Sequence, residues 1–181
     1  MDDKQIINDI LNGNKNAFSL LMDKYHNEIF KYIYNMTKSY ETTEDLMQDI
    51  FMKLYNNLKK YNPNKASFRT WMYRISMHHT MNYFNKAQTR CTNQFVDVDD
   101  LMIASGEDIE NDVIKEKQID EIIRVIKNKL KPKHQNIMLL HYFSGLDVKE
   151  ISEVTEIPIK TIYKAIKSSI QKIQEEVIID E

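Results

Sequence analysis

The chain has 181 residues, of which 42% are hydrophobic and 29% charged, a composition typical of a folded protein rather than a disordered one. Cys91 is the only cysteine, which excludes an internal disulfide and a zinc site built from several cysteines. No stretch approaches the roughly 18 apolar residues of a membrane span and the start is not a signal peptide, so we expect a cytoplasmic protein with no membrane contact of its own.

The formal net charge of −2 conceals an uneven distribution along the chain. Residues 1–90 hold 13 Lys and Arg against 9 Asp and Glu, residues 91–121 hold 2 against 10, and residues 122–181 hold 10 against 8. Two mildly basic parts therefore flank an acidic segment. An acidic overall balance does not exclude nucleic acid as a partner, because binding responds to the local potential.

The first half of the chain predicts four helices, over residues 6–11, 16–36, about 43–60 and 68–85, and the whole chain has only three Gly and three Pro to interrupt them. The third helix has one apolar stripe, formed by Leu46, Ile50, Leu54 and Leu58. Its opposite, polar face carries Asp45, Gln48, Asp49 and Met52. A single exposed methionine is common on protein surfaces. The alternative is a docking surface for a basic partner.

The fourth predicted helix has a core stripe of Phe68, Trp71, Met72, Ile75 and His79. We expect its remaining surface to carry Arg69, Thr70, Tyr73, Arg74 and Met81, followed by Asn82, Asn85 and Lys86. Cations beside aromatic and flat apolar groups suit single-stranded DNA, where bases stack and phosphates need neutralising. For each residue singly, the alternative is a role in covering the helical bundle.

Residues 91–112 show no sustained period and collect acidic side chains, so we predict a linker that stays extended or disordered until bound. Helical spacing returns from Val113, and Asp147 and Glu150 have the spacing of a capping box. The last helix has a narrow apolar stripe, which we expect to form the core, of Ile159, Ile162, Ile166, Ile170, Ile173 and Val177.

The face opposite that stripe is basic and rich in hydroxyl groups, with Lys160, Thr161, Lys164, Lys167 and Ser168. A short helix over residues 147–154, a turn and this last helix together describe a helix-turn-helix. Lysine contributes affinity for phosphates, while Lys, Thr and Ser also reach base edges in the major groove. The alternative is a solvated face of an ordinary helical bundle, and the cap and turn at the right spacing favour DNA binding.

Two blocks of the sequence carry a family resemblance. Residues 130–173, centred on GLDVKEISEVTEIPIKTIYKAIKSSIQKI, resemble the carboxy-terminal DNA-binding domain (region 4) of bacterial sigma-70 family sigma factors. EDLMQDIF at residues 44–51, together with FRTWMYRI at residues 68–75, resembles their amino-terminal domain (region 2). The size and the direct step from one domain to the other are similar to the extracytoplasmic-function class. The family usually has a basic residue and an Asn where Met77 and His78 stand, Lys and Arg where Tyr163 and Ala165 stand, and Gly where Glu156 stands. Because these departures include DNA-reading positions, the resemblance implies the class and not the promoter sequence.

The resemblance implies an all-α protein of two helical domains joined by an acidic linker, with region 2 at residues 1–90, the linker at 91–116 and region 4 at 117–181. It implies binding to core RNA polymerase, both clamp and flap, to promoter DNA and to an anti-sigma factor. The clamp contacts would be Asp45, Gln48, Asp49 and Met52. The contacts to the melted −10 strand would be Arg69, Thr70, Tyr73, Arg74, His78, Asn82 and Lys86. The −35 contacts would be Lys160, Thr161, Tyr163, Lys164, Lys167 and Ser168.

Other function classes have less support. His78 and His79 point about 100° apart on a helix, His134 and His141 lack the carboxylate partner of a zinc protease motif, and no Gly-rich phosphate loop occurs. We therefore expect no enzyme, no metal and no cofactor. The remaining alternative is a helix-turn-helix repressor or activator that works without polymerase, although the sequence has no heptad seam for a dimer and that function leaves Met52 unexplained.

Overall fold

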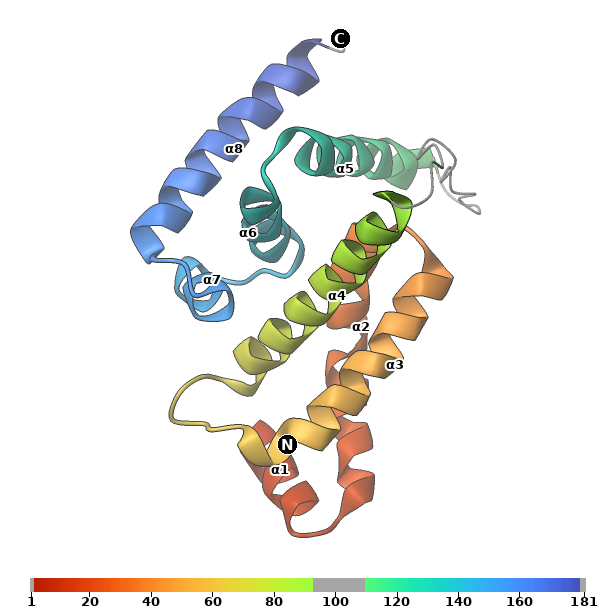
Figure 1. Cartoon of the computed structure of the whole chain (residues 1–181), viewed down its shortest axis with the longest axis vertical. Helices are drawn as coiled ribbons and strands as arrows, with labels where there is room; N and C mark the ends of the chain where they lie inside the picture. Colours follow the sequence, from red (N-terminus) through yellow and green to blue (C-terminus); the bar gives the residue numbers. More distant parts are fainter. Residues whose placement is uncertain (1, 93–109, 180–181) are drawn as a thin grey trace. The chain divides into compact units, whose positions relative to one another are not determined.

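The computed structural model describes residues 2–92 and 110–179, and the chain divides into two compact units, Met1–Leu101 and Met102–Glu181. Every regular element within the described residues is helical (Figure 1), which confirms the predicted all-α class. The predicted linker lies largely outside the described residues, because they leave out residues 93–109. Its flanks, predicted as linker from residue 91 and up to residue 116, are helical up to Thr92 and again from Glu110.

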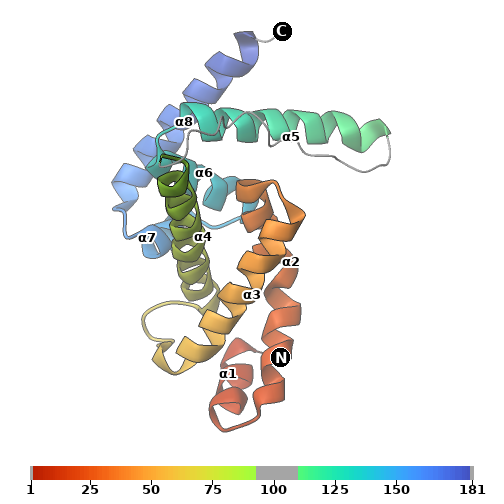
Figure 2. The same ribbon diagram turned by 45° about the vertical axis from the view of Figure 1, so that its right-hand side comes forward.

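The first unit contains α1 (Asp3–Leu11), α2 (Phe18–Thr37), α3 (Tyr40–Asn57) and α4 (Phe68–Thr92), with short 3-10 turns at Lys15–Ala17 and Leu58–Lys60. Helices α2 and α3 run side by side (Figure 2), and α4 packs against both. The bend between α2 and α3 is made by Lys38, with a left-handed φ of 53°, and by Ser39, whose side chain accepts a hydrogen bond from Thr42 N at 3.3 Å.

The core of the first unit follows the predicted stripe of α3. Leu46, Ile50, Leu54 and Leu58 are 0–4% exposed and pack against the apolar face of α2. At the other end, Asp3 of α1 accepts hydrogen bonds from Lys24 at 2.5 Å and from the Tyr25 hydroxyl at 2.6 Å. Burial, followed by the bond to Asp3, raises the pKa of Tyr25 above its usual range, so the phenol stays protonated and holds α1 on α2.

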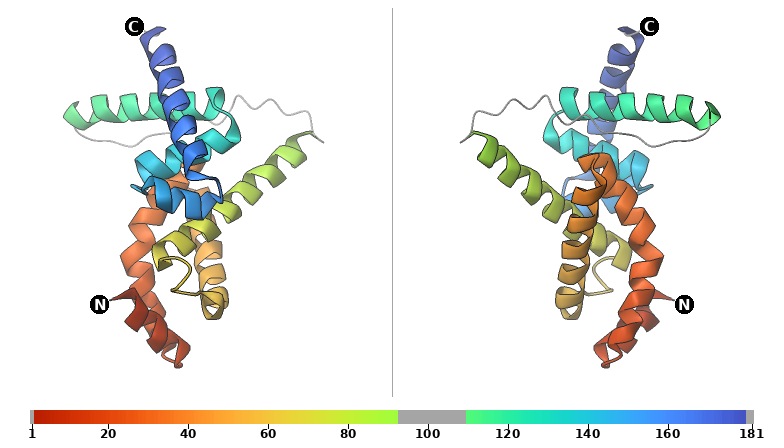
Figure 3. Two further views of the ribbon diagram at one scale, coloured as in Figure 1. Left: turned by 90° about the vertical axis from the view of Figure 1, so that its left-hand side faces the viewer. Right: turned by 90° about the vertical axis from the view of Figure 1, so that its right-hand side faces the viewer.

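The second unit contains α5 (Glu110–Lys129), α6 (Pro132–Phe143), α7 (Val148–Thr155) and α8 (Ile159–Ile179). Helix α8 contacts α5, α6 and α7 (Figure 3). The predicted capping box is confirmed: Asp147 accepts from Glu150 N at 2.7 Å, and Glu150 accepts from Asp147 N at 2.9 Å. Gly145 has the left-handed φ of 59° expected after α6.

The buried face of α8 differs from the predicted isoleucine stripe. Ile162 is fully buried, but Ile159 is 43% exposed and Ile166, Ile170 and Ile173 are half-buried. The small side chains Ala165 and Ser169 are buried instead. They allow α8 to lie close to its neighbours, so the centre of its buried face is shifted toward them. The predicted position of Val177 lies outside the residues whose side chains are described.

Candidate protein and nucleic-acid interfaces

The outer face of α3 brings four predicted contact residues together. Asp45, Gln48 and Asp49 are exposed, and Met52 between them is 63% exposed. Because the opposite face of the helix is buried in the core, these side chains share one solvent-facing surface, hereafter the α3 outer face. Carboxylate and amide oxygens around an exposed thioether can accept hydrogen bonds from basic side chains while Met52 supplies apolar contact area.

His79 of α4 reaches the edge of this α3 outer face, a contact that the sequence did not reveal. Its Nε2 lies 3.3 Å from Asp49 Oδ2, and its Nδ1 is in hydrogen-bond contact with Lys53 Nζ. Burial and the nearby Lys53 lower the pKa of His79, and Asp49 opposes that shift. Helical spacing placed His79 in the core stripe, and its half-buried position at the edge shows where that stripe ends.

The prediction that Thr70 and Tyr73 lie on the surface of α4 is wrong, since they are 1% and 0% exposed. Helix α4 packs against two helices, so its buried arc is wider than one stripe and is rotated toward Tyr73, Ser76 and Thr80. Thr70 lies at the helix start, where its hydroxyl is 2.8 Å from Ser67 Oγ and its backbone N–H donates to the same oxygen. Both residues are therefore structural in the folded chain.

Glu28 of α2 organises the amino-terminal end of α4. Its Oε1 accepts from Arg69 Nε at 2.5 Å and from the Tyr73 hydroxyl at 3.0 Å, and the Arg69 guanidinium lies 5.5 Å from the Tyr73 ring centroid. Arg69 is half-buried in this cluster. Sequence reasoning missed Glu28, because it is 41 residues from Arg69 and only the packing of α2 on α4 brings them together.

The exposed side of α4 carries the other predicted strand contacts. His78, Asn82 and Lys86 are exposed and Arg74 is half-buried. Trp71, predicted as a core residue, is also only half-buried, and its ring centroid lies 5.4 Å from that of Tyr61 in the loop before the helix. The helical period puts Trp71, Arg74, His78 and Asn82 on one side, which therefore offers an aromatic platform beside a cation and polar groups.

The predicted basic face of α8 is present near its amino end. Lys160, Thr161, Lys164, Lys167 and Ser168 are exposed, and Tyr163 is 60% exposed. Helix α7, the turn at residues 156–158 and α8 form the helix-turn-helix. The turn depends on Glu156, which has a left-handed φ of 59°, and on Ser152, whose hydroxyl donates to Ile157 O at 2.7 Å.

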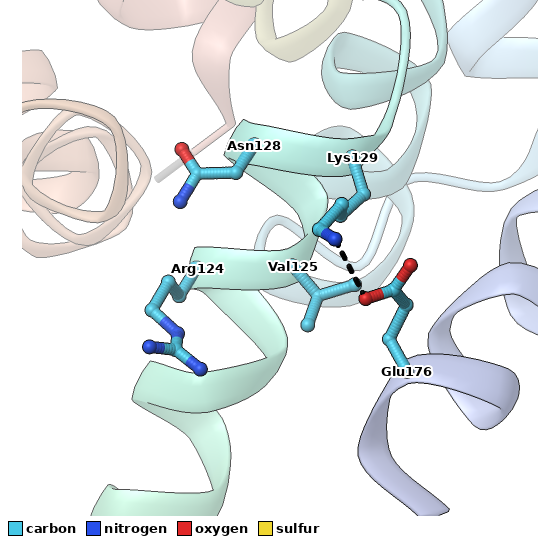
Figure 4. Close-up of a pocket in the computed structure, with 5 residues that line it drawn as sticks. All are labelled: Arg124, Val125, Asn128, Lys129 and Glu176. Atoms are coloured by element: carbon cyan, nitrogen blue, oxygen red, sulfur yellow. Dashed lines mark ion pairs between the residues drawn. The ribbon is translucent and has the colours of Figure 1, made fainter. Parts of the chain in front are cut away.

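A shallow pocket lies between α5 and the carboxyl half of α8 (Figure 4), lined by Arg124, Val125, Asn128, Lys129 and Glu176. Lys129 and Glu176 form an ion pair across it at 2.9 Å. This pair ties α5 to α8 and lies several turns from Lys160 and Lys164, so the pocket is separate from the basic face.

Within the described parts of the chain, no group of three or more His, Cys, Asp or Glu side chains is placed to hold a metal ion. Likewise, no helix within the described residues is long and apolar enough to cross a membrane.

Comparisons with known proteins agree with this arrangement. Residues 21–102 match the model of sigma-70 region 2, and residues 120–173 match that of sigma-70 region 4. Among curated proteins, the ECF RNA polymerase sigma factor SigW of Bacillus subtilis is 26% identical over 167 residues, which cover 88% of each chain. The RNA polymerase sigma factor YlaC of the same organism is 29% identical over 136 residues, covering 74% of this chain and 76% of YlaC.

Solved structures have the same fold at 15% identity. CnrH, solved in complex with the cytosolic domain of CnrY, gives a TM-score of 0.73 and is covered to 99%, as is this chain. RpoE, solved with the anti-sigma factor NepR from Bartonella quintana, gives a TM-score of 0.71 over 91% of this chain and 98% of RpoE. From the two family models and these relatives, the chain belongs to the sigma-70 family, as a transcription initiation factor of the extracytoplasmic-function class.

Proposed function

We propose that the chain binds core RNA polymerase through the α3 outer face and promoter DNA through the exposed sides of α4 and α8. The observation that carries this proposal is the presence of two different exposed faces on two units. One face is acidic and contains an exposed methionine, and the other is basic and belongs to a helix-turn-helix. Such faces suit a basic protein surface and DNA phosphates respectively.

The proposed polymerase contact is centred on Met52. Met52 is an apolar side chain that is 63% exposed between acceptor groups. Its burial by a partner that excludes water would make the free energy of binding more favourable. Asp45, Gln48 and Asp49 would accept hydrogen bonds from basic residues of the clamp. A second polymerase contact, between the helix-turn-helix unit and the flap, is proposed from the family alone.

The proposed contact to the melted −10 strand uses the exposed side of α4. Trp71 and Tyr61 would stack with bases, while Arg74 and Lys86 neutralise phosphates and His78 and Asn82 offer polar contacts. Arg69 contributes charge next to this surface from its place beside Glu28. Because Thr70 and Tyr73 are buried, the proposal assigns them no contact with DNA.

The proposed contact to the −35 element uses α8. Its basic face would enter the major groove, where Lys160, Lys164 and Lys167 bind phosphates or guanine edges and Thr161, Tyr163 and Ser168 make further polar contacts. We propose that the protein works in the cytoplasm without catalysing a reaction. We also propose that an anti-sigma factor restrains it, since RpoE was solved with one.

Run-off transcription tests this function. Core polymerase is incubated with a library of promoter fragments, with and without the full chain, and the transcripts are sequenced. The proposal expects transcripts that start at specific promoters only when the chain is present. Tight binding to duplex DNA without polymerase, together with no new transcripts, would instead identify a repressor.

A further inference from the structure

The side chain of His79 leaves α4 and lies between two residues of α3, Asp49 and Lys53. Its side chain is 14% exposed, whereas that of Asp49 is 63% exposed. A largely buried ring from one helix therefore holds an exposed carboxylate on the α3 outer face.

Only one protonation state of His79 fits both contacts. The Lys53 ammonium has donors and no acceptor, so Nδ1 of His79 must accept its hydrogen bond. The ring proton then lies on Nε2, which faces Asp49 Oδ2 at 3.3 Å in an electrostatic contact rather than a hydrogen bond. An imidazolium has a proton on both nitrogens and would repel Lys53, so protonation breaks one of the two contacts.

We propose that neutral His79 is a positioning residue for polymerase binding, which fixes Asp49 on the α3 outer face, holds Lys53 beside that face, and releases Lys53 when the ring takes up a proton. The inference rests on the proposed polymerase contact of that face. His79 contacts the edge of the α3 outer face from α4 and would not itself contact the polymerase.

The charges around the His79 ring determine how polymerase affinity should depend on pH. Asp49 and Lys53 act on it from α3, and Lys86 acts on it from α4. Burial and Lys53 lower the pKa of His79 below the ordinary histidine value of about 6.5, so the ring is neutral at pH 7. Protonation releases Lys53 and adds a positive charge at the edge of an acidic face that meets a basic partner, which weakens their attraction. Polymerase affinity should therefore be highest above about pH 6.5 and should fall as the pH decreases through the lowered pKa.

Two substitutions separate positioning from simple packing. In His79→Gln, the amide can accept from Lys53 and donate to Asp49 but does not titrate, so both contacts survive at every pH. In His79→Ala, both contacts are lost at every pH. His26→Gln is the matched control, because His26 is a half-buried histidine of the same unit that lies outside the proposed interfaces.

The experiment measures the affinity of the full chain for core polymerase between about pH 7.5 and about pH 5, a range that extends well below the ordinary histidine value because the pKa of His79 is lowered. For His79→Gln we expect wild-type affinity at the upper pH and a smaller loss on acidification than in wild type or His26→Gln. For His79→Ala we expect about a 3- to 10-fold loss at the upper pH. Thermal unfolding of each variant shows whether the first unit remains folded.

If His79→Gln keeps the full wild-type pH dependence of polymerase affinity, or if His79→Ala binds like wild type, the positioning role of His79 is overturned. Asp45→Arg in the same assay tests the underlying interface: if it binds normally, the proposed polymerase contact of α3 fails. Loss of binding in Asp45→Arg alone would leave that contact standing and remove only the role of His79.

Discussion

Met52 is the side chain through which the α3 outer face should contribute most to polymerase binding. Because it is 63% exposed, Met52→Ala should change the free energy of unfolding by less than about 0.5 kcal/mol. In the complex the loss of a buried contact should weaken core-polymerase affinity about 10-fold or more. Fluorescence anisotropy with labelled protein measures this loss.

Leu20→Ala is the matched control for Met52→Ala. Leu20 is 45% exposed on α2 and is not part of the α3 outer face. Its truncation should leave polymerase affinity unchanged. An equal loss of affinity in both variants would show that Met52 has no special place in the interface.

Glu28 should stabilise the first unit by accepting two hydrogen bonds from α4. Glu28→Ala leaves the buried Tyr73 hydroxyl and Arg69 without this acceptor, so we expect a loss of about 1–3 kcal/mol in the free energy of unfolding. Urea unfolding followed by circular dichroism measures it. Asn27→Ala, at the exposed neighbouring position, should cost much less; equal losses would contradict the role given to Glu28.

The buried side of α4 could be predicted only in part from its residue types. Phe68 and Met72 are buried as their spacing predicted, but so are Thr70 and Tyr73, which look like surface residues in the sequence. Their burial depends on partners such as Ser67 and Glu28, and the latter lies on another helix. The sequence therefore predicts the existence of this helix better than the side that it buries.

Glu156 has a strained backbone conformation in the turn of the helix-turn-helix. It has a left-handed φ of 59° between α7 and α8, a conformation that costs a residue with a side chain about 1 kcal/mol or more. Glu156→Gly should relieve this strain and raise the free energy of unfolding of the second unit by up to about 1 kcal/mol. Hydrogen exchange of the α7 and α8 backbone amides in the full chain, followed by mass spectrometry, measures the change in the second unit.

Glu153→Gly is the control for that gain. Glu153 lies inside α7, where glycine should lower the stability by about 0.5–1 kcal/mol. A destabilising effect of Glu156→Gly similar to that of Glu153→Gly would mean that the Glu156 side chain contributes more than its backbone strain costs.

Local signals predict the ends of the elements well. The capping box at Asp147 could be recognised from the sequence, because it depends on residues within one helical turn. The buried face of α8 could not, since Ala165 and Ser169 replace the outer isoleucines only where neighbouring helices approach closely. The basic face opposite was still identified, because charge identifies the exposed side of a helix independently of packing.

At the scale of the whole molecule, the two units have different proposed partners, so charge changes in them should have different effects. Lys164→Glu, on the exposed face of α8, should weaken promoter binding by the polymerase complex about 10-fold. It should also make that binding less sensitive to salt, because one phosphate contact is lost. Filter binding at several salt concentrations measures both effects, and an unchanged salt dependence would argue against a phosphate contact.

The order of the two units and their family could be predicted from sequence blocks, because each block combines helical spacing with particular side chains. The coupling between helices within a unit could not be predicted. Glu28 with Arg69 and His79 with Asp49 are contacts between residues on different helices, 41 and 30 positions apart in the sequence. They became evident only from the packing of α4 on α2 and α3.

The affinity of core polymerase for Asp45→Arg and Lys164→Glu variants tests the division between the two units most directly. Both variants place a reversed charge on an exposed helix face, so they are matched in kind. The account predicts a loss of about 10-fold or more for Asp45→Arg and no change for Lys164→Glu. Equal losses in the two variants, or wild-type affinity in Asp45→Arg, would contradict it.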